Sequence, residues 1–410
     1  MKIFGSVLIV LAILLMVQTA FTQNVEYVGS VPLDGIEAFA ISGNFAYCPL
    51  WDSLAIIDIS NPASPTLVDQ IHLPGYGIGI DINGNYAYVA NALDSCLQVL
   101  DISNAENPSL LASSNLPDMA YDVYVNGNYA YVADYLSGLQ IVDISNPSHP
   151  QSVGYYDTPG NAYSVYTLDN YAYVADNRSG LQIINISNPA SPILSGNYDT
   201  QGRAMDLQIM GDYACVADFD AGMQIINISD PTNPSLAGGC DTWSFAYGID
   251  LFGNYAYIAD GDQNFQIIDI SNPANPTTVI RYGSIDFAYK VCVYNNYIYV
   301  ANFSSLLILR FNPTGIDGSN GVPNIFSLSQ NYPNPFNPIT QINYTLPKDD
   351  AINISIYNLL GQKVAILFDG MQNAGEHSIK WNAKDFPSGV YFARLESDGR
   401  AENIKMVLLK

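Results

Sequence analysis

The sequence predicts an all-β fold, a seven-bladed β-propeller followed by a small β-sandwich, on three observations. A strand-and-turn stretch at residues 138–150 (GLQIVDISNPSHP) returns at nearly fixed intervals along most of the chain. A second phrase at residues 127–134 (GNYAYVAD) keeps the same interval. Charged residues make up only 13% of the chain while tyrosines number 30, which is typical of a chain rich in strands and turns.

The repeat has seven units. Its acidic or amide position recurs at intervals of 43, 42, 42, 42, 42 and 41 residues, at Asp58, Asp101, Asp143, Asn185, Asn227, Asp269 and, in a degenerate copy, Arg310. Because two units carry Asn there, we expect a side-chain oxygen that accepts a hydrogen bond from the following turn, not a ring of metal-binding carboxylates. The same expectation holds for a second position, which is occupied by Asn91, Asp134, Asp176, Asp218, Asp260 and Asn302.

Each unit is predicted to be an antiparallel meander of four short strands. In the third complete unit the strands are expected at residues 120–125, 128–133, 139–144 and 151–156, with turn residues between them. Such a sheet is apolar on both faces and needs a neighbour on each side, and four-stranded units of this length are typical of propeller blades. Tyr47-Cys48-Pro49 is expected to disrupt the second strand of the first unit, and Asn104-Ala105 lacks the first turn proline.

The two ends of the repeat array predict how the ring closes. Residues 24–32 resemble an outer strand, whereas the seventh unit ends after residues 305–311 without one. We therefore expect the N-terminal segment to supply the outer strand of the last blade, which removes two exposed sheet edges. The propeller is expected to span residues 23–313.

Residues 1–22 are interpreted as a secretory signal peptide, with Lys2, an apolar run at residues 3–16, and the small residues Ala20 and Thr22 placed for cleavage. No later apolar run reaches the roughly 18 residues of a membrane span, so no transmembrane segment is expected after signal removal. The five cysteines are few and odd in number. A disulfide framework is therefore not expected, while a single bridge stays open.

The charge of the chain is concentrated in the repeats. Residues 24–313 hold 5 Lys and Arg against 29 Asp and Glu, whereas residues 314–410 hold 8 against 9. Such an acidic surface repels phosphate backbones, so nucleic acid is excluded as a partner.

The sequence nominates no catalytic or metal-binding residue and no cofactor. The three histidines occupy unrelated repeat positions, which argues against a His-based zinc site or a catalytic triad. The acidic pairs Asp218/Asp220 and Asp260/Asp262 lack the fuller ligand run of a calcium loop. A non-enzymatic binding module is therefore the preferred function. A secreted hydrolase that uses rim carboxylates, for example on glycans, and a purely structural surface protein remain alternatives.

Candidate binding residues lie in loops expected at one end of the propeller, between strands two and three and between strand four and the next unit. They are Trp51, Tyr135, Arg178, Arg203, Phe219, Trp243 and Phe245. Aromatic and Arg side chains on one rim suit recognition of an extracellular protein or carbohydrate. The alternative is that these residues serve packing alone.

Beyond the repeats, residues 314–325 read as a flexible linker and residues 326–410 as a second domain. Strand-like runs at residues 340–346, 352–357, 363–368, 377–381, 390–395 and 403–409 have the spacing of a small Ig-like β-sandwich.

Two known families resemble parts of this chain. The phrase LQIVDISNP with YAYVAD before it resembles the LVIVD repeat family of β-propellers in all seven units. That resemblance implies a secreted or surface protein, and it implies no catalytic residue. Residues 326–410 resemble the type A C-terminal sorting domain of type IX secretion substrates, through QNYPNPFNP at residues 330–338, SGVYF at 388–392 and KMVLLK at 405–410.

The second resemblance implies export by the type IX secretion machinery, with the protein either released or attached to the outer surface of a bacterial cell. The residues that carry the sorting motif would be Tyr332, Pro333, Asn334, Pro335, Phe336, Asn337, Pro338, Gly389, Tyr391, Lys405 and Lys410.

Overall fold

The computed structural model describes residues 25–262, 265–283, 286–312, 326–328, 331, 334, 336–346, 348–359, 361–373, 375–397 and 400–409. The expected signal peptide and linker lie outside these residues. The chain divides into two compact units, Met1–Phe311 and Asn312–Lys410. None of the described elements is a helix long and apolar enough to cross a membrane.

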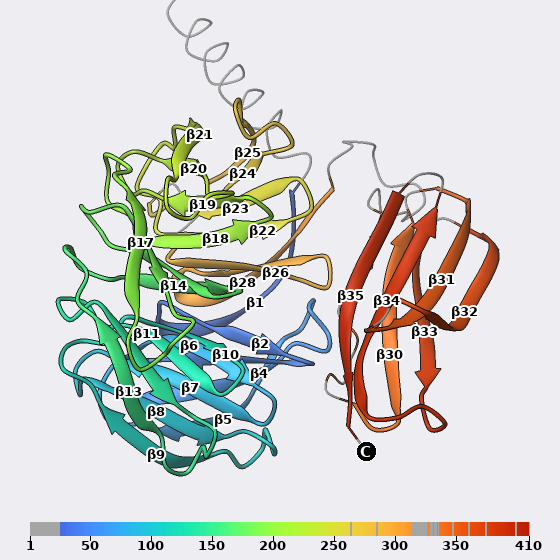
Figure 1. Cartoon of the computed structure of the whole chain (residues 1–410), viewed down its shortest axis with the longest axis horizontal. Coiled ribbons are helices and arrows are strands. Elements are labelled where there is room, and N and C mark those ends of the chain that lie inside the picture. The colour runs from blue at the N-terminus through green and yellow to red at the C-terminus, as the bar shows by residue number, and fades with distance from the viewer. Residues whose placement is uncertain are drawn as a thin grey trace, which may run out of the picture. The chain divides into compact units, whose positions relative to one another are not determined.

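The first unit consists of seven four-stranded antiparallel sheets, the blades, whose inner strands lie nearer the middle and outer strands at the margin (Figure 1). The inner strands are β2 (Ala40–Ser42), β6 (Gly77–Asn83), β10 (Asp122–Asn126), β14 (Ser164–Leu168), β18 (Asp206–Met210), β22 (Gly248–Phe252) and β26 (Lys290–Tyr294). The second strands are β3 (Phe45–Pro49), β7 (Tyr86–Asn91), β11 (Tyr129–Ala133), β15 (Tyr171–Ala175), β19 (Tyr213–Ala217), β23 (Tyr255–Ala259) and β27 (Tyr297–Ala301).

The third strands are β4 (Ser53–Asp58), β8 (Cys96–Asp101), β12 (Leu139–Asp143), β16 (Leu181–Asn185), β20 (Met223–Asn227), β24 (Phe265–Asp269) and β28 (Phe303–Phe311). The outer strands are β5 (Thr66–His72), β9 (Ser109–Asn115), β13 (Gln151–Tyr156), β17 (Ile193–Tyr198), β21 (Ser235–Cys240), β25 (Thr277–Tyr282) and, in the seventh blade, β1 (Val25–Ile36).

The meander predicted for the third unit agrees with β10 to β13 within two residues at each boundary. The expected disruption of the first blade is wrong, because β3 pairs with β4 without a break from Phe45↔Asp58 to Pro49↔Leu54. Pro49 is the last residue of its strand, where the missing backbone N–H interrupts no ladder.

Strand β1 pairs with β28 from Val25↔Phe311 to Ile36↔Phe303. Its bulge, between Tyr27 and Gly29, lies where other outer strands carry theirs, as β13 does opposite Ile141 and Val142. The other face of β1 meets the first blade. A Cβ added at Gly29 would lie 2.3 Å from the carbonyl oxygen of Pro62, just as a Cβ at Gly154 would lie 2.0 Å from that of Pro189 in the next blade.

The cores of the propeller lie between successive blades. One buried cluster joins the second strand of the third blade to the fourth blade, with Tyr131 and Ala133 against Val165 and Val174. An equivalent cluster joins the seventh blade to the first, where Val31 of β1 and Ile308 pack with Ala46 and Ile57. Burial of each Val or Ile side chain contributes roughly 1.5–3 kcal/mol to the free energy of folding.

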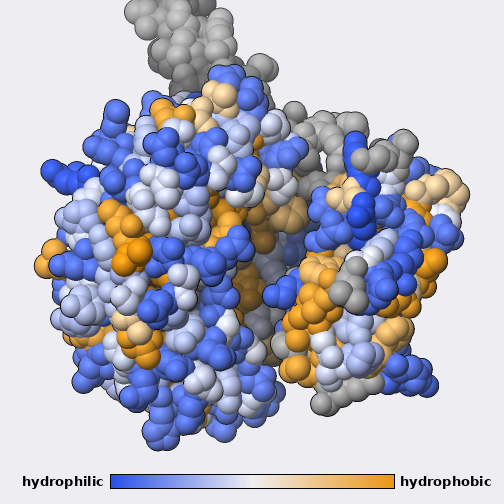
Figure 2. Space-filling model, viewed as in Figure 1, coloured by the Kyte–Doolittle hydropathy of each residue, from blue (hydrophilic) through white to orange (hydrophobic). Residues whose placement is uncertain are grey.

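In the face of this unit seen in Figure 2, hydrophilic residues predominate and apolar residues form separate spots.

The expected role of the first recurring acidic or amide position is confirmed. In six units the side-chain oxygen accepts a hydrogen bond from the backbone N–H two residues later, at 2.8–2.9 Å, in the pairs Asp58–Ser60, Asp101–Ser103, Asp143–Ser145, Asn185–Ser187, Asn227–Ser229 and Asp269–Ser271. An amide oxygen serves as well as a carboxylate, which explains why the position tolerates loss of charge.

The second unit contains two sheets. One has the order β29-β30-β33, with β29 (Ser327–Leu328), β30 (Ile339–Leu346) and β33 (Gly375–Asn382). The other has the order β32-β31-β34-β35, with β31 (Asp350–Asn358), β32 (Lys363–Gln372), β34 (Gly389–Ser397) and β35 (Arg400–Leu408). Side chains from both sheets form one buried cluster, which includes Ile342 and Trp381 from the first sheet and Ile354 and Leu395 from the second.

Candidate functional site

One end of the propeller gathers two sets of loops. Successive strands of a blade run in opposite directions, so the loop between strands two and three lies at the same end as the segment entering the next inner strand. We call this the loop end. Single-residue bridges connect four of these loops, in the third to sixth blades, to the segment entering the following blade, at Tyr135↔Ala162, Asn177↔Ala204, Phe219↔Ala246 and Gly261↔Ala288.

The second recurring Asp or Asn position is a structural hydrogen-bond acceptor, as the sequence predicted, but the donors to Asp176 precede it by 16 and 18 residues and do not lie in the following turn. The Oδ1 atom of Asp176 accepts a hydrogen bond from the Thr158 hydroxyl at 2.6 Å, and its Oδ2 atom accepts one from the Gly160 N–H at 2.8 Å. Burial raises the pKa of the Asp176 carboxyl to about 6 and that of Asp218 to about 7. Because burial penalises the charged form, the neutral amide of Asn91 can take the same place.

A cavity of about 190 Å³ opens at the loop end where the inner strands begin. One residue from each blade, always at the same repeat position, lines it. These seven residues, which we call the collar, are Glu37, Ile78, Tyr121, Tyr163, Met205, Tyr247 and Tyr289. Because every blade contributes one of them, the collar surrounds the propeller axis.

The collar combines tyrosines with one carboxyl. Burial raises the pKa of Glu37, and the Tyr76 hydroxyl donates a hydrogen bond to its carboxyl. Burial also raises the pKa of Tyr121, and that of Tyr289 to about 12, so these hydroxyls stay protonated at neutral pH. The collar is therefore an aromatic wall with hydroxyl donors and a single acid.

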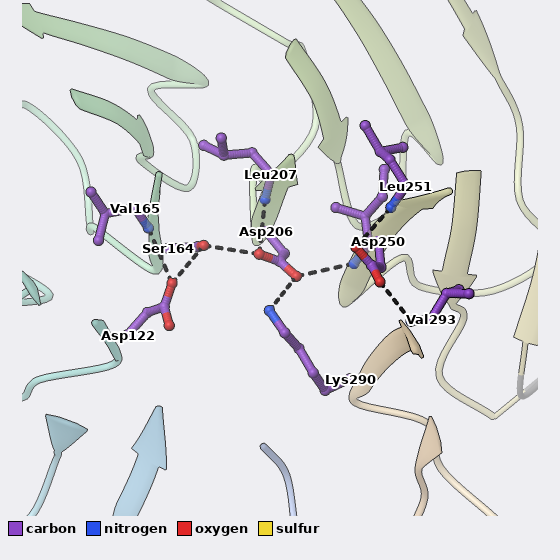
Figure 3. A network of polar contacts seen from close by, with 10 residues as sticks. Asp122, Ser164, Val165, Asp206, Leu207, Asp250, Leu251, Lys290 and Val293 are labelled. Atoms are coloured by element: carbon purple, nitrogen blue, oxygen red, sulfur yellow. Dashed lines mark hydrogen bonds and ion pairs between the residues drawn. The ribbon is translucent and has the colours of Figure 1, made fainter. Parts of the chain in front are cut away.

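Four polar side chains on four inner strands, Asp122, Ser164, Asp206 and Lys290, form the floor of the cavity. They belong to the larger polar network drawn in Figure 3. The Lys290 ammonium lies 2.8 Å from Oδ2 of Asp206. The Ser164 hydroxyl lies 2.8 Å from Asp122 and 2.9 Å from Asp206. A hydroxyl has one proton, so Ser164 can donate to only one of these carboxyls at a time. Burial raises the pKa of the Asp122 carboxyl.

Inner-strand carboxyls also connect some neighbouring blades. Asp81 accepts a hydrogen bond from the Val125 N–H at 2.7 Å, and Asp250 accepts one from the Val293 N–H at 2.6 Å. In both cases the donor lies on the inner strand of the following blade. These contacts supply a hydrogen-bond acceptor to backbone N–H groups on the exposed edges of the inner strands, which would otherwise be unpaired.

Aromatic rings extend the collar outward in two groups. Around the third and fourth blades, Tyr135 lies 5.2 Å from Tyr121 and 5.8 Å from Tyr163 between ring centroids. From the fifth to the seventh blade, successive contacts of 4.3–6.2 Å connect Phe245, Phe219, Tyr247, Phe287, Tyr289 and Phe303.

Three of these aromatic residues have a left-handed backbone, with φ of 42° at Tyr135, 47° at Phe219 and 54° at Phe303. The corresponding residue of the sixth blade is Gly261, with φ of 54°. Glycine adopts this conformation without steric cost, whereas a bulky residue is a genuine outlier there. The rings at the loop end are thus held in place at the expense of backbone strain.

The structure brings some of the sequence-predicted rim residues together and leaves others apart. Tyr135, Phe219 and Phe245 belong to the two ring groups, and the Arg203 guanidinium lies over the Phe219 ring at 4.8 Å. Trp51 stacks on Tyr76 at 4.5 Å, and Tyr76 in turn contacts Glu37.

The remaining two rim residues lie away from the rings. Trp243, 66% exposed, lies against Arg281 of the outer strand β25 at 3.8 Å. Arg178 is exposed. Neither of them lines the cavity.

Sequence reasoning missed the collar and the inner-strand carboxyls. A usable signal existed for the collar, since tyrosine stands two residues before the first core residue of the inner strand in four units. For Asp81 and Asp250 the signal was an acid between two apolar positions of an inner strand. Within the described ranges, no three His, Cys, Asp or Glu side chains are grouped so as to hold a metal ion.

The LVIVD repeat family matches seven segments, residues 37–72, 74–115, 117–158, 159–200, 201–242, 245–284 and 287–309. The chain belongs to the LVIVD-repeat family. The matched segments follow the blades, so the family repeat and the structural repeat coincide in this LVIVD-repeat protein.

Solved structures support the propeller fold. The LVIVD-repeat protein is similar to the computationally designed protein Ika8, with 11% identity and a TM-score of 0.54, covering 70% of this chain and 99% of that one. It is also similar to the β-propeller domain of Cps50 (Swd1) from Myceliophteria thermophila, with 10% identity, a TM-score of 0.57 and the same coverage. At such identities the likeness concerns the fold alone. The comparison with curated proteins finds no match.

A second family, the secretion system C-terminal sorting domain, matches residues 330–409. The LVIVD-repeat protein is therefore a secreted protein, handled by the type IX secretion system and delivered to the outer cell surface. This agrees with the localisation expected from the sequence.

Residues of the sorting motif connect the start of the sorting domain to its last strand, β35. Asn334 accepts a hydrogen bond from the Val407 N–H at 2.7 Å, and the buried Phe336 bridges to Leu408. The Tyr391 hydroxyl donates to the Pro387 carbonyl at 2.8 Å. Asn337 is exposed, Gly389 begins β34, and Lys405 lies on β35. Pro338 accepts a hydrogen bond from Ala383, whereas Tyr332, Pro333, Pro335 and Lys410 lie outside the described residues.

Proposed function

We propose that this LVIVD-repeat protein is a secreted, non-enzymatic binding module that holds an extracellular protein or carbohydrate at its loop end. The observation that carries the proposal is the set of aromatic rings at the loop end, where four collar tyrosines line the cavity and three further rings, each on a left-handed backbone, pack against them. Each such residue costs roughly 1–3 kcal/mol, and such strain persists mainly at ligand-binding and active sites. Gly261 occupies the equivalent position, so the fold itself does not require a ring there.

Catalysis receives no comparable support. Of the three carboxyls that line the cavity, Asp206 holds Lys290 and the Ile249 N–H, and Asp122 holds Ser164 and the Val165 N–H, which leaves only Glu37 without such a structural role. A glycoside hydrolase needs a free acid and a free base or nucleophile on either side of the scissile bond. The arrangement of the described carboxyls therefore favours binding over hydrolysis.

The test is a variant that removes rings without stressing the backbone. In Phe219→Gly/Phe303→Gly, glycine is suited to both left-handed conformations, and the relief of backbone strain offsets part of the lost ring contacts, so the variant should stay folded at about 25 °C. The matched control is Tyr155→Ser on the outer strand β13, where the Tyr155 side chain is 67% exposed. All three proteins are applied to arrays of glycans and of extracellular proteins.

We expect the wild type and the Tyr155→Ser control to bind the same spots and the double variant to lose them. Binding that survives in the double variant contradicts the proposal. So does product formation on an array that is abolished by single Asp→Asn changes, which would favour the hydrolase. Absence of any ligand for the wild type would favour a purely structural role.

A further inference from the structure

Glu37 is the only charged residue of the collar. Its carboxyl has the Tyr76 hydroxyl as a hydrogen-bond partner, and burial raises its pKa. In the part of the chain that the structure describes, no Lys or Arg nitrogen lies within 4.0 Å of it. A carboxylate withdrawn from water is costly unless a cation or several donors compensate it. In the described part of the chain, the Glu37 carboxyl therefore has no Lys or Arg side chain with which to form an ion pair.

The cations of the repeats are engaged elsewhere. Of the five Lys and Arg residues, Arg203, Arg281 and Arg310 each lie over an aromatic ring, at 4.8, 3.8 and 4.7 Å from its centroid. Lys290 is held by Asp206, and Arg178 is exposed. None of these five cations compensates Glu37, so its carboxyl either keeps its proton or pairs with a cation supplied by another molecule.

Four tyrosines complete the chemistry of the collar. The face of an aromatic ring attracts a cation, by roughly 0.5–2 kcal/mol per contact depending on desolvation. Tyr121, Tyr163, Tyr247 and Tyr289 all line the cavity together with Glu37. Aromatic walls with one carboxylate are suited to an ammonium group that carries an apolar stem.

The size and depth of the cavity restrict the ligand further. A cavity of roughly 150 Å³ holds a molecule the size of benzene, and the volume here is about 190 Å³. That suits one side chain, whereas drug-sized ligands occupy roughly 300–1,000 Å³. The floor already pairs its own cation, Lys290, with Asp206 at 2.8 Å, whereas Glu37 in the collar has no such ion pair. An entering ammonium would therefore find its partner at the level of the collar, beside Glu37.

We infer that the collar is a receptor for an alkylammonium group, specifically the side chain of a lysine exposed on a partner protein. This inference rests on the proposed function and commits it to a protein partner in place of a glycan at the central cavity. The ammonium pairs with Glu37, the butyl stem lies against the tyrosine rings, and the acidic surface of the repeats raises the encounter rate with cationic partners.

The experiment is calorimetric titration of the mature full chain with Nα-acetyl-lysine methylamide. The matched probes are the same compound acetylated on Nε, which keeps the stem and removes the charge, and methyl glucoside. The variants are Glu37→Gln, which preserves the shape of the side chain, and Tyr247→Leu. The control is Glu106→Gln, the same change at an exposed glutamate in the turn between β8 and β9, at the opposite end of the propeller.

We expect the lysine probe to bind the wild type and Glu106→Gln equally. Glu37→Gln and Nε-acetylation should each weaken binding about 10- to 100-fold, the usual effect of losing a charged hydrogen-bond partner. Tyr247→Leu should weaken it about 2- to 30-fold. The unfolding temperature of each variant, measured in parallel, shows whether it is folded.

Three outcomes overturn the inference. They are equal affinity for the lysine and Nε-acetyl-lysine probes, unchanged affinity in Glu37→Gln, and an equal loss of affinity in Glu106→Gln. If the lysine probe fails while array ligands still depend on Phe219 and Phe303, the inference falls and the proposed function stands. If no array ligand depends on those rings either, both fall.

Discussion

One added methyl group tests the position of β1 between β28 and the first blade. In Gly29→Ala the new Cβ would lie 2.3 Å from the Pro62 carbonyl oxygen and 3.2 Å from a ring carbon of Pro65. Gly154→Ala is the matched change within the array, with its Cβ 2.0 Å from the Pro189 carbonyl oxygen. Gly283→Ala is the control, because no heavy atom lies within 4 Å of its added Cβ.

The expected magnitude follows from these distances. Carbon atoms do not approach a carbonyl oxygen this closely, and because the obstacle is backbone, one blade must move away from the next. Overpacking of this kind costs about 1–3 kcal/mol. For a unit of this size, 1 kcal/mol shifts the unfolding midpoint by roughly 2–4 °C, so we expect both variants to melt roughly 2–12 °C below the wild type.

Differential scanning calorimetry of the full chain and the three variants makes the comparison. Gly29→Ala and Gly154→Ala should lower the propeller transition by similar amounts, and Gly283→Ala should leave it unchanged. A Gly29→Ala protein that melts like Gly283→Ala would refute the contact between β1 and the first blade, and with it the closed ring.

Three further predictions concern pH, sorting and the second unit. The folded-state pKa of Asp218, about 7, lies above the unfolded value of roughly 3.9, so the native state retains a proton that the unfolded chain releases. In urea unfolding, the stability of the wild type should therefore fall relative to that of Asp218→Asn as the pH rises from about 4 to 7. A stability difference that stays constant over this range would contradict the prediction. Deleting residues 326–410 should leave the propeller transition intact but the protein in the periplasm on cell fractionation, and normal surface delivery would refute the sorting assignment. Asn334→Ala, which leaves the Val407 N–H without its acceptor, should destabilise the second unit by about 1–3 kcal/mol in urea unfolding, whereas the exposed Asn337→Ala should change little.

The blades were predictable because each of their determinants is local. Alternating apolar residues mark the strands, and Ser-Asn-Pro marks the turn after the third strand, so the repeat gave strand bounds within two residues in the third blade. The exception is Pro49, which looks disruptive in an alignment of repeats and is harmless at the end of β3. Whether a proline interrupts a strand ladder depends on which residue it pairs with and on its place in the strand. The sequence alone does not show this pairing.

The collar was not predictable in the same way. Its seven positions are occupied by tyrosine in four units and by Glu37, Ile78 and Met205 in the other three, so the tyrosine signal marks only part of it. The position acquires meaning only when the inner strands surround one axis and bring residues from all seven blades to one cavity. Aromatic loop residues were recognised from sequence, but their grouping around this cavity depends on the left-handed conformations of Tyr135, Phe219 and Phe303.

The central claim is that the loop end binds its partner through the collar, and a crystal structure of the protein with bound Nα-acetyl-lysine methylamide tests it most directly. The account predicts the ammonium nitrogen about 2.7–2.9 Å from a carboxylate oxygen of Glu37, with the stem between the rings of the collar tyrosines. A probe bound outside the collar, or a collar cavity that stays free of the probe in crystals saturated with it, would contradict the account.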